Sequence, residues 1–267
     1  RYGADALRYY LLSSPVVHGE DLNFSERGVA DAYRKNVVRL QNVLTFHKTF
    51  AEGVTPAEGE SAHVLDRWIL SRLSTLSSQM TDGFEHYELD RATKPIADFI
   101  DDLSTWYLRR SRQRIKEGGD TPTIGAGDAG HAVATLEYVL KTFATLIAPI
   151  MPFVAEEIFQ ELRSESDPES VHLVPWPALG APDTDVLTRM AEVRAVVSSA
   201  LELRAQAGIK VRQPLASLTV PQTFLPEYAE LIRDEVNVKE VRVGAELLLD
   251  TTLTHELIIE GQIRDVV

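Results

Sequence analysis

The chain has 267 residues, of which 44% are hydrophobic and 25% charged, as in a folded globular protein and unlike a disordered one. It has no cysteine, which excludes disulfides and thiolate metal sites. The net charge of −13 argues against a general nucleic-acid binder, because neutralising phosphates favours a basic surface.

The distribution of apolar residues predicts a cytoplasmic protein that does not enter a membrane. No apolar run approaches the ~20 residues of a membrane span, and no signal sequence is seen. The chain begins with Arg1 without an initiator methionine and stops at Val267 inside an apolar pattern. We therefore expect an excised part of a longer protein.

Four segments have apolar residues at the three- and four-residue intervals of a helix. In the last of them, Pro149 and Pro152 must kink or split the helix, because each removes a backbone donor and clashes with the preceding turn. Long helices joined by short-to-medium loops predict an antiparallel bundle. The expected helices are 31–50, 64–80, 89–117 and 132–162.

Two connecting segments are rich in glycine and proline, at 52–59 and 118–130. The second could be mistaken for a phosphate-binding loop. No strand precedes it, however, and no lysine-serine or lysine-threonine pair closes it. The pattern predicts a flexible loop.

After residue 177 the pattern changes. One more helix is expected at 184–207, with Gly208 as its C-cap, and a shorter one at 226–235. Alternating apolar residues predict strands at 215–220, 238–243 and 247–250. The predicted fold is mainly α, an antiparallel helical bundle followed by a small mixed α/β module. The predicted boundaries are 1–30, 31–180 and 181–267.

Catalytic and metal chemistry find little support in the sequence. The seven histidines are scattered, and no pair of them is spaced to converge on a metal. The acidic pair Asp101-Asp102 lies in an expected helix, where adjacent side chains point ~100° apart. We predict no catalytic residue and no metal site.

The basic residues, in contrast, are clustered. Between Trp106 and Lys116 there are five basic residues and no acidic one. Planar guanidinium groups beside an aromatic ring suit RNA, because rings stack on unpaired bases and guanidinium forks bind phosphates and base edges. The alternative is that Trp106 and Tyr107 are core residues and the arginines solvate the helix end. Spacing alone leaves both open. Shorter basic clusters are Arg34, Lys35 and Arg39, and Lys210 and Arg212.

Resemblance to a known family favours RNA. Residues 101–114 read DDLSTWYLRRSRQR and resemble the signature of the anticodon-binding domain of isoleucyl-tRNA synthetases. Thr105 stands where this family often has asparagine, and Ile115-Lys116 replace an aromatic pair often seen there. Further segments resemble the same family in the expected order: 3–12, 65–73, 148–159, 209–215 and 235–239.

The resemblance implies a class I synthetase whose full-length form uses ATP and Mg²⁺ to activate isoleucine and then charges tRNA-Ile. Neither a His-x-Gly-His motif nor a Lys-Met-Ser-Lys-Ser loop is present. We therefore expect an inactive fragment of an isoleucine–tRNA ligase, without ATP, Mg²⁺ or other cofactor, monomeric, with tRNA-Ile and the missing catalytic domain as partners. Residues 1–30 resemble a stem-contact segment.

The resemblance leaves two alternatives open. One is a stand-alone helical RNA-binding or protein-interaction module derived from a synthetase, and the other is a fragment of a valyl-tRNA synthetase. Trp106 is the expected stacking residue, and the neighbouring arginines are expected to bind phosphates or base edges. The candidate RNA-binding residues are Trp106, Arg109, Arg110, Arg112, Arg114, Lys116, Arg72, Lys94, Lys210 and Arg212.

Overall fold

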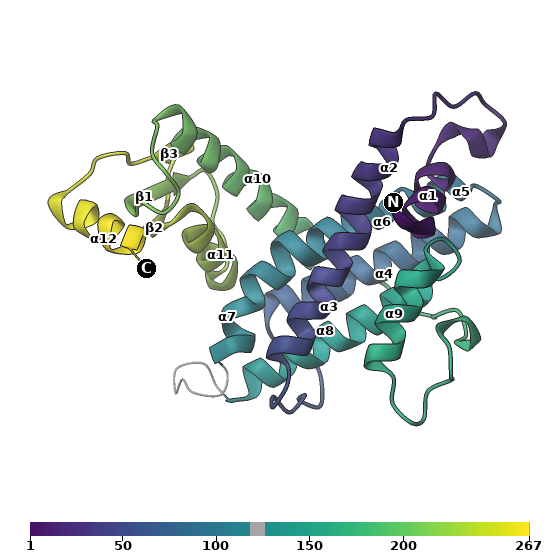
Figure 1. The fold of residues 1–267 in the computed structure, drawn as a ribbon. Helices are drawn as coiled ribbons and strands as arrows, with labels where there is room; N and C mark the ends of the chain where they lie inside the picture. Colours follow the sequence, from purple (N-terminus) through teal and green to yellow (C-terminus); the bar gives the residue numbers. More distant parts are fainter. Residues whose placement is uncertain (118–125, 267) are drawn as a thin grey trace. The chain divides into compact units, whose positions relative to one another are not determined.

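A computed structural model describes residues 1–117 and 126–266 of the chain (Figure 1). The chain divides into two compact units, Arg1–Asp183 and Thr184–Val267. Residues 1–30, expected as a separate segment, belong to the first unit. Among the described residues, no helix is long and apolar enough to cross a membrane.

The first unit is a helical bundle, and the chain as a whole has the mainly α architecture that the sequence predicts. Two of its helices each contain a π-helical stretch, Tyr33–Val38 and Asp102–Leu108. Short 3-10 helices occur at Pro15–His18 and Val171–Leu173. The α-helices are α1 (Gly3–Leu12), α2 (Glu26–Ala32), α3 (Arg39–Phe50), α4 (Val64–Glu85), α5 (Leu89–Thr93), α6 (Pro95–Asp101), α7 (Arg109–Glu117), α8 (Ala126–Ile147) and α9 (Pro152–Leu162).

The helix boundaries confirm one sequence-based expectation and correct two others. The helix expected at 132–162 is split as predicted, because Pro149 lies in the turn after α8 and Pro152 begins α9. The glycine-rich loop expected at 118–130 lies largely outside the described residues. Its last five residues, 126–130, belong to α8 and are helical. The helix α1 was not predicted.

The helix α1 is fastened to the turn between α8 and α9 by two opposite charges. The buried Asp5 carboxylate accepts hydrogen bonds from the backbone nitrogens of Phe153 and Val154, at 3.2 and 2.7 Å, and so caps the first turn of α9. Arg8 donates to the carbonyls of Pro149 and Ile150, at 2.7 and 2.9 Å. A negative charge thus meets the start of one helix, and a positive charge meets the carbonyls that follow the end of another.

The bundle core consists of large apolar side chains on the inner faces of the long helices. Phe99 of α6 and Phe143 of α8 are fully buried with ring centroids 4.8 Å apart. Ile69 and Leu73 of α4 and Leu140 of α8 are also fully buried. This continuous core holds α7, which carries half of the candidate residues, against α8.

The second unit is a small α/β module. Its strand order is β2-β1-β3, with β1 parallel to β2 and antiparallel to β3. The parallel pair is connected through α11, as a parallel pair requires a crossover. The elements are α10 (Thr184–Gln206), β1 (Leu215–Val220), α11 (Pro226–Val236), β2 (Val238–Val243), β3 (Leu248–Leu249) and α12 (His255–Val266).

The cap of α9 gives a first prediction. Replacing Asp5 by alanine removes the acceptor of two backbone N–H groups and should lower the free energy of unfolding by about 1–2 kcal/mol. Asp5→Asn keeps an acceptor oxygen and should cost less. Urea unfolding of both variants measures the difference; equal losses would contradict the capping role.

Candidate nucleic-acid interface

The helices α3 and α7 lie side by side. At the start of α3, Arg39 Nη1 is 2.6 Å from Oδ1 of Asp101. Further along, the Arg112 guanidinium lies over the Phe46 ring, 5.5 Å from its centroid, and Lys116 Nζ lies 4.1 Å from the centroid of the Phe50 ring. Residue numbers rise together along both helices, so α3 and α7 run in the same direction, although consecutive long helices of the bundle alternate.

Two cations of α7 are held here by aromatic rings, and the described residues give neither an acidic partner. We call Arg112 and Lys116 the cation ridge; they are one helical turn apart, and both are exposed. Phe46 and Phe50 beneath them are also one turn apart, with ring centroids separated by 4.8 Å. Within the described part of the chain, neither Arg112 nor Lys116 forms an ion pair. In the described structure both side chains are exposed, so their charges can meet an anion from the solvent.

Three further candidates precede the cation ridge on the same helical path. Trp106 lies half-buried in the π-helical stretch before α7. Arg109 is exposed, and its Nε donates to the carbonyl of Thr105 at 2.8 Å. Arg110 is half-buried. The structure thus places these three and the cation ridge on one continuous stretch of helix.

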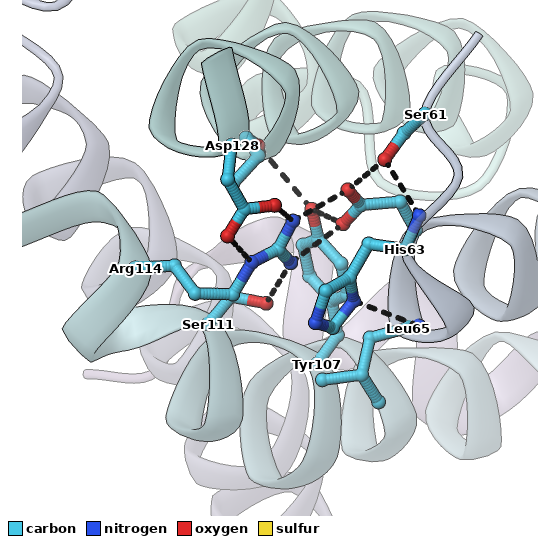
Figure 2. A network of polar contacts seen from close by, with 9 residues as sticks. Ser61, His63, Leu65, Tyr107, Ser111, Arg114 and Asp128 are labelled. Atoms are coloured by element: carbon cyan, nitrogen blue, oxygen red, sulfur yellow. Dashed lines mark hydrogen bonds and ion pairs between the residues drawn. The ribbon is translucent and has the colours of Figure 1, made fainter. Parts of the chain in front are cut away.

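Arg114 is different, because its guanidinium is buried between two carboxylates (Figure 2). It forms a forked pair with Asp66 of α4, at 3.0 and 2.8 Å, and a second with Asp128 of α8, at 2.8 and 2.6 Å. With 7% of its surface exposed, Arg114 has almost no contact area for a nucleic acid. The structure therefore gives this predicted RNA-binding residue a place in the core.

The carboxylate oxygens of Asp66 also accept hydrogen bonds from two hydroxyl groups. Ser61 Oγ donates to one oxygen at 2.6 Å, and Tyr107 Oη donates to the other at 2.9 Å. Tyr107 Oη is also 3.2 Å from the carbonyl of Ala132 in α8. We call Ser61, Asp66, Tyr107, Arg114 and Asp128 the buried network. It joins α4, α7 and α8 and thereby fixes the rotation of α7.

The charges of the buried network stabilise one another. Burial pushes the pKa of Asp66 upward, but the hydrogen bonds and charge of Arg114 outweigh burial and leave this pKa below its ordinary value. Hydrogen bonding to Arg114 likewise lowers the pKa of Asp128. Burial raises the pKa of the Tyr107 hydroxyl well above its usual range. The two aspartates are therefore ionised and Tyr107 is neutral near pH 7.

Two other candidates in the first unit have acidic partners. Arg72 Nε is 2.7 Å from the buried Asp102 carboxylate. Lys94 Nζ is 2.6 Å from Asp90, and this hydrogen bond lowers the pKa of Asp90 to about 2. Lys94 also lies about 27 Å from Arg112 along the helical path, at a rise of ~1.5 Å per residue. The structure does not bring Lys94 to the cation ridge.

The last two candidates, Lys210 and Arg212, lie in the second unit on an exposed loop after α10. Buried Arg204 supports this loop by donating to the carbonyls of Lys210 and Gln213, at 3.0 and 2.9 Å, and to those of Val236 and Asn237, at 2.8 and 2.9 Å. Burial lowers the pKa of Arg204 to about 10, so it stays charged. The loop is therefore held in a fixed shape.

Sequence reasoning missed the residues that support the site. Phe46 and Phe50 were read only as parts of a helix, although two phenylalanines one turn apart indicate a continuous aromatic face. Asp66 and Asp128 gave no signal, because their partner is distant in sequence. Within residues 1–117 and 126–266, no group of three or more His, Asp or Glu side chains is placed to hold a metal.

Comparison with family models gives a match over the middle of the chain. Residues 66–220 match the family model described as the anticodon-binding domain of tRNA ligase. The chain belongs to this family. The match includes α7, all of the buried network except Ser61, and the loop that carries Lys210 and Arg212.

Individual relatives are named isoleucine–tRNA ligase. The chain is 42% identical over 256 residues to the isoleucine–tRNA ligase of Chlamydia muridarum and 41% identical over 252 residues to that of Chlamydia pneumoniae. These alignments cover 92% and 90% of this chain but 24% of each relative. The chain therefore spans about a quarter of the length of these relatives.

A comparison with solved structures gives a more distant likeness. It is to a ternary complex of Agrobacterium radiobacter K84 agnB2 LeuRS with tRNA and LeuAMS, with a TM-score of 0.43 and 16% identity. That alignment covers 69% of this chain and 20% of the other.

The buried network predicts a large cost for removing its cation. Arg114→Met leaves Asp66 and Asp128 without the cation between them and should lower the free energy of unfolding by about 3–5 kcal/mol. Arg112→Met, two residues away but exposed, is the matched control and should cost less than about 0.5 kcal/mol. Urea unfolding measures both, and similar small losses would contradict a buried ion network.

Acid should weaken the same network. The folded Asp66 and Asp128 hold their protons less tightly than the unfolded carboxylates, so their stabilisation is full above the ordinary value of 3.8 and lost as the pH falls through the folded pKa. Unfolding between pH 7 and pH 2.5 should show this loss. Asp66→Asn should show a shallower fall, and parallel curves would contradict the assignment.

Proposed function

We propose that this chain is the tRNA-binding part of an isoleucine–tRNA ligase and that the α3–α7 face contacts the anticodon stem-loop of tRNA-Ile. The observation that supports this face most directly is the cation ridge, two exposed cations that form no ion pair with the residues the structure describes, in a chain whose net charge is −13. Membership of the anticodon-binding family and the relatives named isoleucine–tRNA ligase support the choice of RNA.

The side chains on this face suit different parts of an RNA. Arg112 and Lys116 are assigned to backbone phosphates, because they are exposed and rest on aromatic rings, which leave their charge intact. Trp106 is assigned to stacking on an unpaired base, and Arg109 and Arg110 to phosphates or base edges. Lys210 and Arg212, on the supported loop of the second unit, are assigned to a separate contact with the same RNA.

Three candidates are left out of the proposed contact. Arg114 stabilises the bundle from within. Arg72 and Lys94 are each paired with a carboxylate, which cancels much of the charge that a phosphate would meet. The proposed contact therefore uses seven of the ten candidate residues that the sequence predicts.

The whole enzyme is part of the same proposal. In a full-length isoleucine–tRNA ligase, ATP and Mg²⁺ serve the activation of isoleucine in the part of the enzyme outside this chain. This chain would bind and position tRNA-Ile for that part and would perform no chemistry by itself. We propose a monomer acting in the cytoplasm.

Binding to RNA tests the proposal. The chain is titrated with an isoleucine tRNA transcript, and with the same transcript carrying a changed anticodon, across a salt series. The native transcript should bind more tightly, and Arg112→Ala with Lys116→Ala should reduce the salt slope by about two, because each phosphate contact contributes ~0.9.

Lys94→Ala is the matched control, since it also removes one lysine from the same unit, and it should leave both affinity and salt slope unchanged. Equal binding of both transcripts would contradict anticodon recognition by this chain, and binding of a valine transcript in preference would identify a valyl enzyme. A slope that falls with Lys94→Ala instead would place the contact at the other end of the helix.

A further inference from the structure

The two cations of the ridge are held by aromatic rings in matching register. Phe46 and Phe50 are one turn apart on α3, and Arg112 and Lys116 are one turn apart on α7. Each cation lies over one ring, at 5.5 and 4.1 Å from the centroid. Because α3 and α7 run in the same direction, the same contact is made twice in succession.

An aromatic ring holds a cation in a different way from a carboxylate. The ring attracts the cation through its quadrupole, and the cation keeps its full charge. Elsewhere in this acidic unit, Arg39, Arg72 and Lys94 are held by Asp101, Asp102 and Asp90, whose charges oppose theirs. Phe46 and Phe50 therefore fix the position of Arg112 and Lys116 without neutralising them.

Fixing these side chains in advance favours binding. A free arginine or lysine side chain loses rotamer entropy worth up to ~2 kcal/mol when it is immobilised, and a side chain already resting on a ring loses less. Phe46 is 7% exposed and also fills space between the helices. A leucine could fill much of that space, but it has no ring face for the cation.

We infer that Phe46 and Phe50 are positioning residues that hold Arg112 and Lys116 one turn apart for neighbouring phosphates of the bound RNA. This inference rests on the proposed function, because it concerns how the same face grips RNA. It assigns to two apolar residues of α3 an effect on RNA affinity that acts only through the two cations of α7.

A double-mutant cycle tests the inference. Phe50→Leu should weaken binding of the isoleucine tRNA transcript about two- to fivefold, the range that corresponds to a cation–π contact of ~0.5–1 kcal/mol. In a Lys116→Ala background the same change should have no further effect. The cycle of Phe46→Leu and Arg112→Ala should give the same pattern. Phe50→Tyr, which keeps the ring, should retain wild-type affinity.

A structural role alone would give other results. If Phe50→Leu weakens binding equally with and without Lys116, or if Phe50→Tyr binds as poorly as Phe50→Leu, the positioning role is overturned. Thermal unfolding of each variant identifies any loss caused by misfolding. Should Phe50→Leu misfold, Phe50→Tyr is compared with the wild type, both alone and in the Lys116→Ala background, and this comparison still decides.

A measurement without RNA separates this inference from the proposed function. In the wild-type chain, the side-chain methylene protons next to Nζ of Lys116 should show an upfield NMR shift from the Phe50 ring, and this shift should vanish in Phe50→Leu. If that shift is absent, the ring does not hold the cation and the inference fails. If the shift is present but the wild-type chain binds no RNA, the proposed function fails and the assigned role fails with it.

Discussion

The fork of hydrogen bonds around the Arg114 guanidinium joins three helices of the bundle. It binds Asp66 of α4 on one side and Asp128 of α8 on the other, while Arg114 itself belongs to α7. A buried cation between two buried or half-buried anions is stable only when every hydrogen bond is satisfied, and Ser61 and Tyr107 complete the set around Asp66. Helix α7 can therefore adopt one rotation, and this rotation decides which of its basic residues face the solvent.

The position of α7 explains how an acidic chain presents a basic face. Of five basic residues between Arg109 and Lys116, the fixed rotation buries Arg114 and exposes Arg112 and Lys116 above the phenylalanines of α3. Arg72 and Lys94, the candidates of the first unit that lie outside this stretch, are held by carboxylates. Recognition by a few uncancelled charges on a negative body favours a partner of defined shape over any polyanion.

Regular elements were predictable from the sequence where one pattern dominates. The ranges of β1 and β2 were predicted to the residue from alternation, and Pro149 and Pro152 marked the break between α8 and α9. The helix α1 was not predicted, and two of its side chains, Asp5 and Arg8, bind a turn about 145 residues away. Local patterns do not contain such contacts.

Site residues were predictable as a group and not one by one. Composition alone placed the basic cluster between Trp106 and Lys116, but the side of the helix that each residue occupies depends on the π-helical stretch at Asp102–Leu108, which shifts the helical register. Arg112 and Arg114, two residues apart on α7, point about 200° apart, but the local pattern does not say which of them faces the core. Only the distant partners Asp66 and Phe46 distinguish them.

Hydrogen–deuterium exchange of the chain with and without a saturating isoleucine tRNA transcript tests the central claim most directly. The account predicts slower amide exchange in peptides covering residues 39–50 and 109–116, with little change in peptides around Lys94. Slowed exchange confined to the Lys94 end of the bundle, or to the second unit alone, would contradict the claim that the α3–α7 face is where RNA binds.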